Sequence, residues 1–280
     1  DVYKRQVFQM SEEMFFLHYG KDGCNRHVLI DECRELFGEI YEQIPELPFC
    51  NIWTAMQLSS RLPKGALFHM GVSNTRRCWN MFQLPESVES ACNVGCCGID
   101  GCVSTLVGAS LVNPDRLCYV VVGDLTFFYD LNSLGNHHIG TNLRVMLVNN
   151  GRGTEFRLGI HHCNVFGDDA DKYMAAAGHF GNKSPLLVKH YAEDLGFHYL
   201  SATTKEEFMT ALSNFTNPQL SDHSMILEVF TDSKDESEAL YLMSHIQSDA
   251  KGMVRSKLKD AVRNVAGEKG INAIKKILKK

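Results

Sequence analysis

Two apolar runs stand out in the middle of the chain, "LCYVVVGD" at 117–124 and "LRVMLVNN" at 143–150. Each run is short, continuous and ended by small polar residues, which is typical of a strand buried on both faces of a sheet. Shorter apolar segments predict strands at 65–71, 197–200 and 224–230. Apolar spacings of three and four residues predict helices at 27–44, 52–63, 102–112, 171–177, 186–195 and 205–213, with a short helix within 128–138.

Buried strands that alternate with helices predict the α/β class, as a three-layer, mostly parallel sheet with helices on both faces. In such sheets ligands bind beyond the carboxyl ends of the strands. Gly123 and Asp124 stand at one predicted strand end, and Asn150 stands at another. Asp100 is expected to cap the predicted helix at 102–112 or to supply an acid to its first turn.

Three segments are expected along the chain. Residues 1–50 read as the end of a preceding domain or a linker, 51–245 as the ligand-binding domain, and 246–280 as a basic helical tail. The chain opens with "DVYKRQVFQM" rather than methionine, so we expect a fragment whose N-terminal portion is missing. A hydrophobic content of 44% is enough for a sizeable core.

Charge is spread unevenly around a formal net value of −5. Residues 249–280 hold ten basic and three acidic side chains, so +7, and the rest holds 18 against 30, so −12. An acidic body argues against nucleic acid as its partner. We expect the tail to be a solvated helix packed on the body, with contact to a membrane surface as the less favoured alternative. Ten cysteines without extracellular-type spacing, and no apolar run long enough to span a membrane, predict a cytoplasmic protein.

The residues at the two strand ends suit a magnesium diphosphate. Asp124 offers a carboxylate and Asn150 an amide oxygen, and Mg²⁺ prefers such hard oxygen ligands. A helix that starts after Gly123 would present free N–H groups to phosphate. The two pairs together therefore predict a Mg–diphosphate site, although a strand can also end in Gly-Asp for structural reasons alone.

The same residues carry a resemblance to a known family. Gly-Asp followed about 25 residues later by Asn-Asn resembles the diphosphate-binding motif of thiamine diphosphate (ThDP) enzymes. The stretches "GDLTFFYDLNSL", "NNGRGTEF" and "NVGCCGIDGCVSTLVGA" are similar to the C-terminal domain of the 2-succinyl-5-enolpyruvyl-6-hydroxy-3-cyclohexene-1-carboxylate synthases of menaquinone biosynthesis. The likeness runs from about residue 51 to 235 and implies a ThDP-binding fold, with ThDP and Mg²⁺ as cofactors.

The resemblance implies roles for individual residues. Asp124, the Asn150 side chain and the Arg152 carbonyl would hold Mg²⁺, and Ile99 in "GIDG" would lie under the cofactor and keep it bent. The cofactor-binding residues implied in full are Gly123, Asp124, Leu125, Ile99, Asn150, Arg152 and Gly153.

Substrate contacts are implied for Ser73, Arg77 and Phe156. The chain departs from the family at Val94 in "CNVG", where the family has an arginine that meets an anionic substrate. Arginine is the usual bidentate partner of a carboxylate, so its loss predicts a related reaction on another acid, or a loss of activity.

The activity implied is that of a ThDP- and Mg-dependent transferase or lyase. It would decarboxylate a 2-oxo acid and transfer the resulting carbanion to an acceptor, as a homodimer or homotetramer. The family's activating glutamate lies in an N-terminal domain, and Glu12, Glu13 and Glu32 stand in the wrong context for it. We therefore expect this fragment alone to bind ThDP only weakly and to be inactive. A simple 2-oxo acid decarboxylase and a non-catalytic module with the ThDP fold are the alternatives.

Cysteine and histidine clusters offer weaker hypotheses. Cys92, Cys96, Cys97 and Cys102 lack the tight pairs typical of zinc or iron–sulfur sites, so structural cysteines are expected. The doublet at 161–162 could transfer protons, with an exposed loop as the favoured interpretation.

Overall fold

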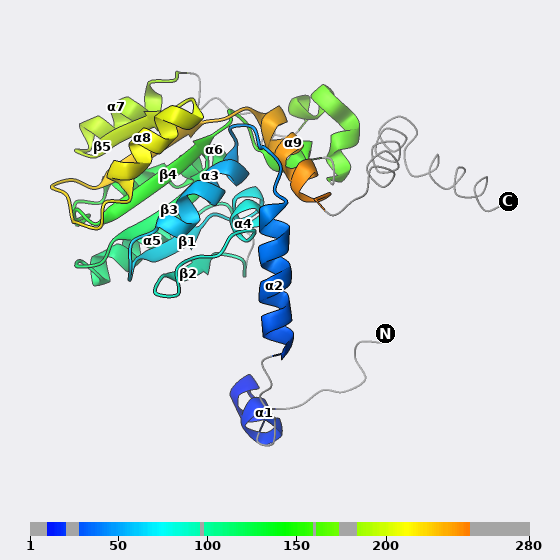
Figure 1. The fold of residues 1–280 in the computed structure, drawn as a ribbon. Helices are drawn as coiled ribbons and strands as arrows, with labels where there is room; N and C mark the ends of the chain where they lie inside the picture. The colour runs from blue at the N-terminus through cyan, green and yellow to red at the C-terminus, as the bar shows by residue number, and fades with distance from the viewer. Residues whose placement is uncertain (1–9, 21–27, 96–97, 159–160, 174–183, 247–280) are drawn as a thin grey trace. The chain divides into compact units, whose positions relative to one another are not determined.

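The computed structural model describes residues 10–20, 28–95, 98–158, 161–173 and 184–246, and they fall into two compact units, 1–44 and 45–280 (Figure 1). The first unit contains α1 (Glu12–Tyr19) and α2 (Val28–Glu42), and α2 confirms the helix predicted there. Most of the predicted helix at 171–177 and nearly all of the basic tail lie outside the described residues. None of the helices within the described ranges has the length and apolar character needed to cross a membrane.

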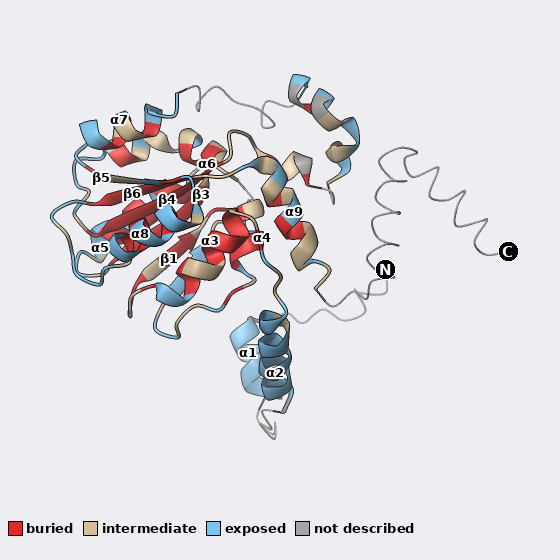
Figure 2. Ribbon diagram, turned by 45° about the horizontal axis from the view of Figure 1, so that its top comes forward, coloured by how far each residue is buried: buried red, intermediate tan, exposed pale blue. Residues whose placement is uncertain are grey.

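The second unit is built on a six-stranded sheet with the order β2-β1-β3-β4-β6-β5, in which every neighbouring pair is parallel. Its strands are β1 (Leu67–Met70), β2 (Glu89–Cys92), β3 (Cys118–Gly123), β4 (Leu143–Asn149), β5 (His198–Ala202) and β6 (Met225–Phe230). The central strands β3 and β4 are buried along almost their whole length, as Figure 2 shows. The predicted parallel α/β sheet is confirmed.

One face of the sheet packs against α5 (Cys102–Val112), α6 (Asp124–Tyr129) and α7 (Leu187–Asp194). Alternate residues of the strands, such as Val120 and Val145, point to this side because successive side chains of a strand face opposite ways. They form one apolar core with residues from all three helices.

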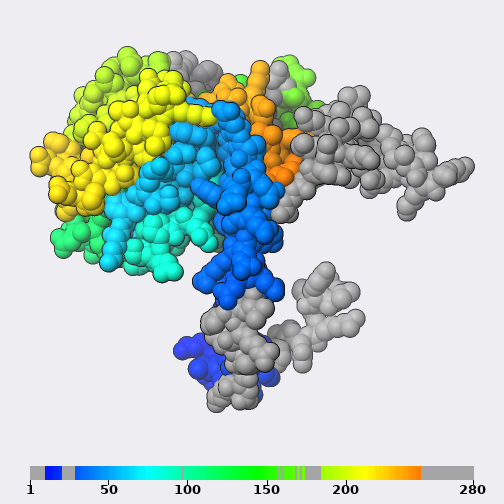
Figure 3. Space-filling view, viewed as in Figure 1, coloured from blue at the N-terminus to red at the C-terminus, as the bar shows by residue number. Residues whose placement is uncertain are grey.

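The opposite face is covered by α3 (Asn51–Leu58), α4 (Asn74–Trp79) and α8 (Lys205–Phe215). The Tyr119 hydroxyl donates to the Phe215 carbonyl over 3.1 Å. Trp53 and Phe208 join α3 to α8 with ring centroids 5.7 Å apart, and the light-blue and yellow segments adjoin on the surface in Figure 3. The sheet is therefore the middle of three layers, as predicted.

Further helices complete the described part of the unit. They are α9 (Ser233–Met243) and the 3₁₀ helices η1 (Ser59–Arg61), η2 (Leu131–Gly135), η3 (Thr154–Arg157) and η4 (His162–Lys172). The elements α4, α9 and β2 were not predicted. The helix α4 has only six residues, and β2 is an exposed edge strand without an apolar pattern.

The expected role of Asp100 at the start of α5 is wrong. Gly101 occupies the cap position with φ 80°, a left-handed conformation that favours glycine. The acid at this helix end comes from Asp130, whose Oδ2 accepts the Ser104 N–H at 2.7 Å. Asp100 lies one residue too early to cap the helix, and Asp130 arrives from a distant part of the chain.

Candidate functional site

The predicted site residues gather where the order of the sheet reverses. From β1 the chain moves outward to β2 and then returns to the other side of β1 to form β3, so the carboxyl ends of β1 and β3 flank a crevice. A cavity of about 280 Å³ lies there. Nine of the ten predicted site residues line it: Ser73, Ile99, Gly123, Asp124, Leu125, Asn150, Arg152, Gly153 and Phe156. Arg77 does not.

Asp124 provides the carboxylate of the site. It is 2% exposed and follows directly after Gly123, the last residue of β3. Its Oδ1 accepts the Leu125 N–H at 2.7 Å, which fixes the side chain at the start of α6. Because α6 has only six residues, a phosphate at its start would meet the remaining N–H groups of the first turn rather than a long helix dipole.

The Asn149–Asn150 pair lies at the neighbouring strand end. The register of β3 and β4 pairs Gly123 with Val148, so the next residues, Asp124 and Asn149, come side by side beyond the ladder. Asn150 Oδ1 accepts the Arg152 N–H at 3.2 Å and thereby bends the loop back on itself. Strand pairing therefore brings the Asp124 carboxylate and the Asn150 amide, which were predicted to share a ligand, to the same end of the sheet.

A buried network holds this loop from behind. Asn149 Nδ2 donates to Glu228 Oε1 at 2.7 Å, and Asn149 Oδ1 accepts the Gly151 N–H at 3.2 Å. The Tyr199 hydroxyl donates to Glu228 Oε2, also at 2.7 Å. Burial raises the pKa of Glu228, while the two hydrogen bonds act to lower it. This network could not be predicted from the sequence, because Asn149, Tyr199 and Glu228 come from three strands that only the sheet brings together.

Ser73 has an unusual backbone. Its φ of 61° and ψ of −123° make it the one non-glycine residue with positive φ in the described part of the chain. It sits between β1 and α4, against the cavity. Such conformations are costly for a residue with a side chain and concentrate at functional sites.

Arg77 is joined to an acid that the sequence analysis did not single out. Its Nη1 donates to Glu155 Oε2 at 2.9 Å and its Nη2 to Oε1 at 3.1 Å. The hydrogen bonds to Glu155 raise the pKa of Arg77, against the effect of partial burial. Glu155 lines the cavity, and 78 residues separate it from Arg77, so no local pattern could have paired them.

The apolar wall of the cavity includes Val72, Ile99 and Phe156. Phe156 lies edge-on to His161 with the ring centroids 5.1 Å apart. Val94, for which the resemblance implies an arginine in the family, is 41% exposed and does not line the cavity.

The oxygen atoms available as metal ligands in the site suit magnesium better than a softer metal. Within the described ranges, no three histidine, cysteine or acidic residues are grouped as a metal centre would need. The structure instead places one buried carboxylate, Asp124, near the amide of Asn150 and the carbonyls of its loop. Mg²⁺ uses one or two carboxylates and completes its shell with phosphate and water, so this donor set fits it.

The sequence of the chain is similar to those of several known proteins. No protein-family model matches it. The 2-succinyl-5-enolpyruvyl-6-hydroxy-3-cyclohexene-1-carboxylate synthase of Bacteroides fragilis is 34% identical over 196 residues, which are 70% of this chain and 34% of that protein. The synthase of Phocaeicola vulgatus is 34% identical over 200 residues, which are 70% of this chain and 34% of that protein. The synthase of Christiangramia forsetii is 33% identical over 199 residues, which are 71% of this chain and 33% of that protein.

The chain is a relative of these synthases. The resemblance expected from the strand-end motifs is therefore confirmed. The chain spans about one third of the length of the synthases that it matches.

Proposed function

We propose that this chain is the diphosphate- and magnesium-binding part of a ThDP-dependent enzyme that decarboxylates a 2-oxo acid and transfers the product to an acceptor. One observation carries the proposal. The pairing of β3 with β4 puts Asp124 and the Asn149–Asn150 loop together at the carboxyl ends of these strands. The chain that does so is 34% identical to a synthase over 196 residues. The cavity, about 280 Å³, is slightly smaller than the usual range for ligand sites, roughly 300–1,000 Å³, so it suits one part of a cofactor.

Each residue of the site has a task in this proposal. Asp124, the Asn150 amide oxygen and the Arg152 carbonyl would hold Mg²⁺. The backbone at Gly123, Leu125 and Gly153 would lie against the diphosphate, with Ile99 beneath the cofactor. When bound, ThDP supplies the electron sink for loss of CO₂ from a 2-oxo acid.

The chain's own residues would position the substrate. Ser73 lines the cavity from a strained backbone, and Phe156 provides an apolar wall. We assign transfer to an acceptor over simple decarboxylation because the relatives are named as synthases. Product analysis with and without an acceptor separates the two reactions. A homodimer or homotetramer is part of the same proposal.

The test is thermal unfolding of the chain with ThDP and Mg²⁺, repeated with EDTA and in Asp124→Ala. At 100 times its Kd, a ligand that binds only the folded state stabilises it by roughly 2.7 kcal/mol. We expect a Mg-dependent shift that Asp124→Ala abolishes, because Asp124 is the buried carboxylate of the site. Asp130→Ala is the matched control, since its carboxylate serves α5, and it should keep the shift.

A non-catalytic module with the same fold is the second candidate, favoured by Val94 in place of the arginine. No Mg-dependent shift at any ThDP concentration would put this candidate first. A shift that survives in Asp124→Ala would contradict the assigned metal ligand.

A further inference from the structure

The guanidinium of Arg77 already has a carboxylate partner within the chain. Both of its terminal nitrogens donate to Glu155, at 2.9 and 3.1 Å, in a two-point pairing that matches the way arginine binds a substrate carboxylate. Both side chains are about two-thirds buried, with 32% and 27% exposed. Glu155 thus fills the place on Arg77 that an anionic substrate would take.

The position of the pair relative to the cavity matters for the substrate. Glu155 lines the cavity and Arg77 does not, so the acid stands on the cavity side of the pair. Among the described residues that line the wall, Asp124 and Glu155 are acidic and Arg152 is basic. The wall therefore carries no excess of positive charge with which to attract a further anionic group.

We propose that Glu155 is a specificity-determining residue that directs the site to 2-oxo acids whose side chain is uncharged. The inference rests on the proposed function and narrows its substrate class. A second carboxylate on the substrate would have to displace Glu155 from Arg77 and leave it partly buried beside another negative charge, which is unfavourable. An uncharged acyl chain would instead meet the apolar side chains of Val72, Ile99 and Phe156.

Two acids of matched length test this. In 2-oxoglutarate a carboxylate stands where 2-oxopentanoate has a methyl group, and the reacting ends are the same. Their affinities are measured by calorimetry on the chain and on Glu155→Gln, with and without ThDP and Mg²⁺. We expect the unsubstituted chain to prefer 2-oxopentanoate. Glu155→Gln should bind 2-oxoglutarate about tenfold more tightly, the value of one charge-assisted hydrogen bond, while its affinity for 2-oxopentanoate stays nearly the same.

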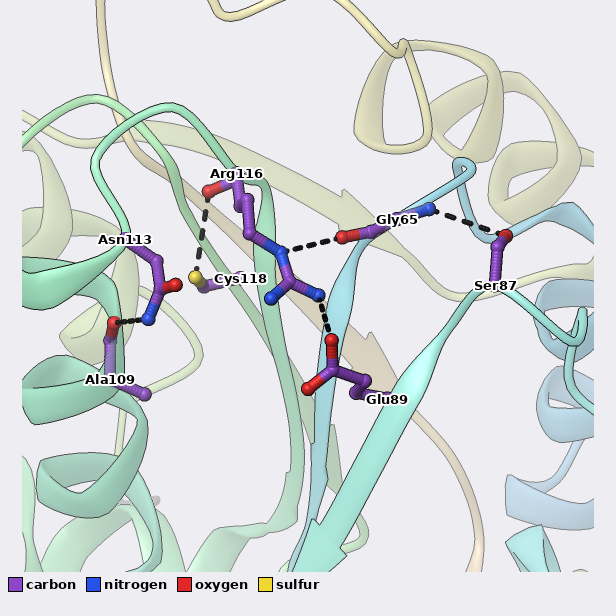
Figure 4. Close-up of polar contacts among 7 residues, drawn as sticks. All are labelled: Gly65, Ser87, Glu89, Ala109, Asn113, Arg116 and Cys118. Carbon is purple, nitrogen blue, oxygen red and sulfur yellow. Dashed lines mark hydrogen bonds and ion pairs between the residues drawn. The ribbon is translucent and has the colours of Figure 1, made fainter.

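The matched control removes the same charge from another arginine–glutamate pair. Arg116 Nη2 donates to Glu89 Oε1 at 2.9 Å, and its Nε donates to the Gly65 carbonyl at 2.8 Å (Figure 4). This pair lies at the amino ends of the strands, opposite the cavity, because Glu89 opens β2. Glu89→Gln should change neither affinity.

Further variants complete the test. The double variant Arg77→Gln/Glu155→Gln should lose the gain in affinity for 2-oxoglutarate. If Glu155→Gln fails to fold, Glu155→Asp takes its place in the test. It keeps the charge on a shorter side chain and should show a smaller gain in that affinity. An unchanged affinity of Glu155→Gln for 2-oxoglutarate, or a gain that persists in the double variant, overturns the inference. If Glu155→Gln gains affinity for 2-oxoglutarate but the chain binds no ThDP and Mg²⁺, the role of Glu155 is upheld and the proposed function is rejected.

Discussion

At the scale of single residues, Glu236 is a buried carboxyl directly behind the cavity. It lies on α9 and is 1% exposed, and its Oε1 accepts the Asn51 N–H at 3.0 Å and the Thr231 hydroxyl at 2.7 Å. Burial, more than any other cause, raises its pKa to about 7. Asn51 lines the cavity, so this carboxyl supports the backbone of the site.

The raised pKa predicts a dependence of stability on pH. The unfolded chain releases this proton near pH 4.5 and the folded chain near pH 7, so the folded state binds more protons between these values. The free energy of unfolding should therefore fall as pH rises through this window, by on the order of 3 kcal/mol from this group. Glu236→Gln should remove the fall and be the more stable protein at pH 8, as measured by urea unfolding.

The control for this prediction is Glu238→Gln on the same helix, which replaces an exposed carboxyl and should keep the slope of the unsubstituted chain. Equal slopes for all three proteins would show that Glu236 does not hold its proton.

At the scale of elements, β4, β5 and β6 act together on the Asn149–Asn150 loop. The network from Tyr199 through Glu228 to Asn149 ties one residue of each strand to the next. Its last hydrogen bond, from the Gly151 N–H to Asn149 Oδ1, sets the turn that presents Asn150 and the Arg152 carbonyl. Groups that orient metal ligands from behind commonly change metal affinity 10- to 100-fold when they are removed.

Glu228→Ala should therefore weaken Mg²⁺ binding by about tenfold in the ThDP-saturated chain, because Asn149 loses its acceptor. The measurement is a Mg²⁺ titration followed by thermal unfolding. Glu228→Gln, which keeps an oxygen for Asn149, serves as the control and should bind nearly as well as the unsubstituted chain. If both variants bind Mg²⁺ equally, the loop holds its shape without the network.

At the scale of the whole molecule, the chain corresponds to about one third of its synthase relatives. The described acids on the cavity wall are Asp124 and Glu155. One is proposed to hold the metal and the other pairs with Arg77. The resemblance places the glutamate that activates the cofactor in an N-terminal domain, so a further surface would have to supply it.

We therefore predict that this chain, given ThDP and Mg²⁺, releases no CO₂ from 2-oxo acids. The measurement is CO₂ release with cofactor binding followed on the same sample, which distinguishes a loaded but inactive site from an empty one. Turnover by the chain alone would mean that a carboxylate within it activates the cofactor.

Much of the fold could be predicted because it depends on short-range patterns. The buried strands β3 and β4 were recognised as continuous apolar runs in the sequence. The helix α5 has the predicted bounds because its whole length carries an unbroken helical pattern. The exposed edge strand β2 buries too little apolar surface to leave a pattern. The helix α4 buries Trp79, but at six residues it is too short to show a helical period.

Local sequence patterns were enough to predict a parallel α/β protein with candidate ligand groups at the ends of two strands, because strand burial and strand-end chemistry are both local. Which groups meet there depends on the folded structure. Arg77 and Glu155 are 78 residues apart, and Asn149 and Glu228 are 79 apart. Such partners are set by strand order and register, which depend on how every layer packs at once, so no local pattern records them.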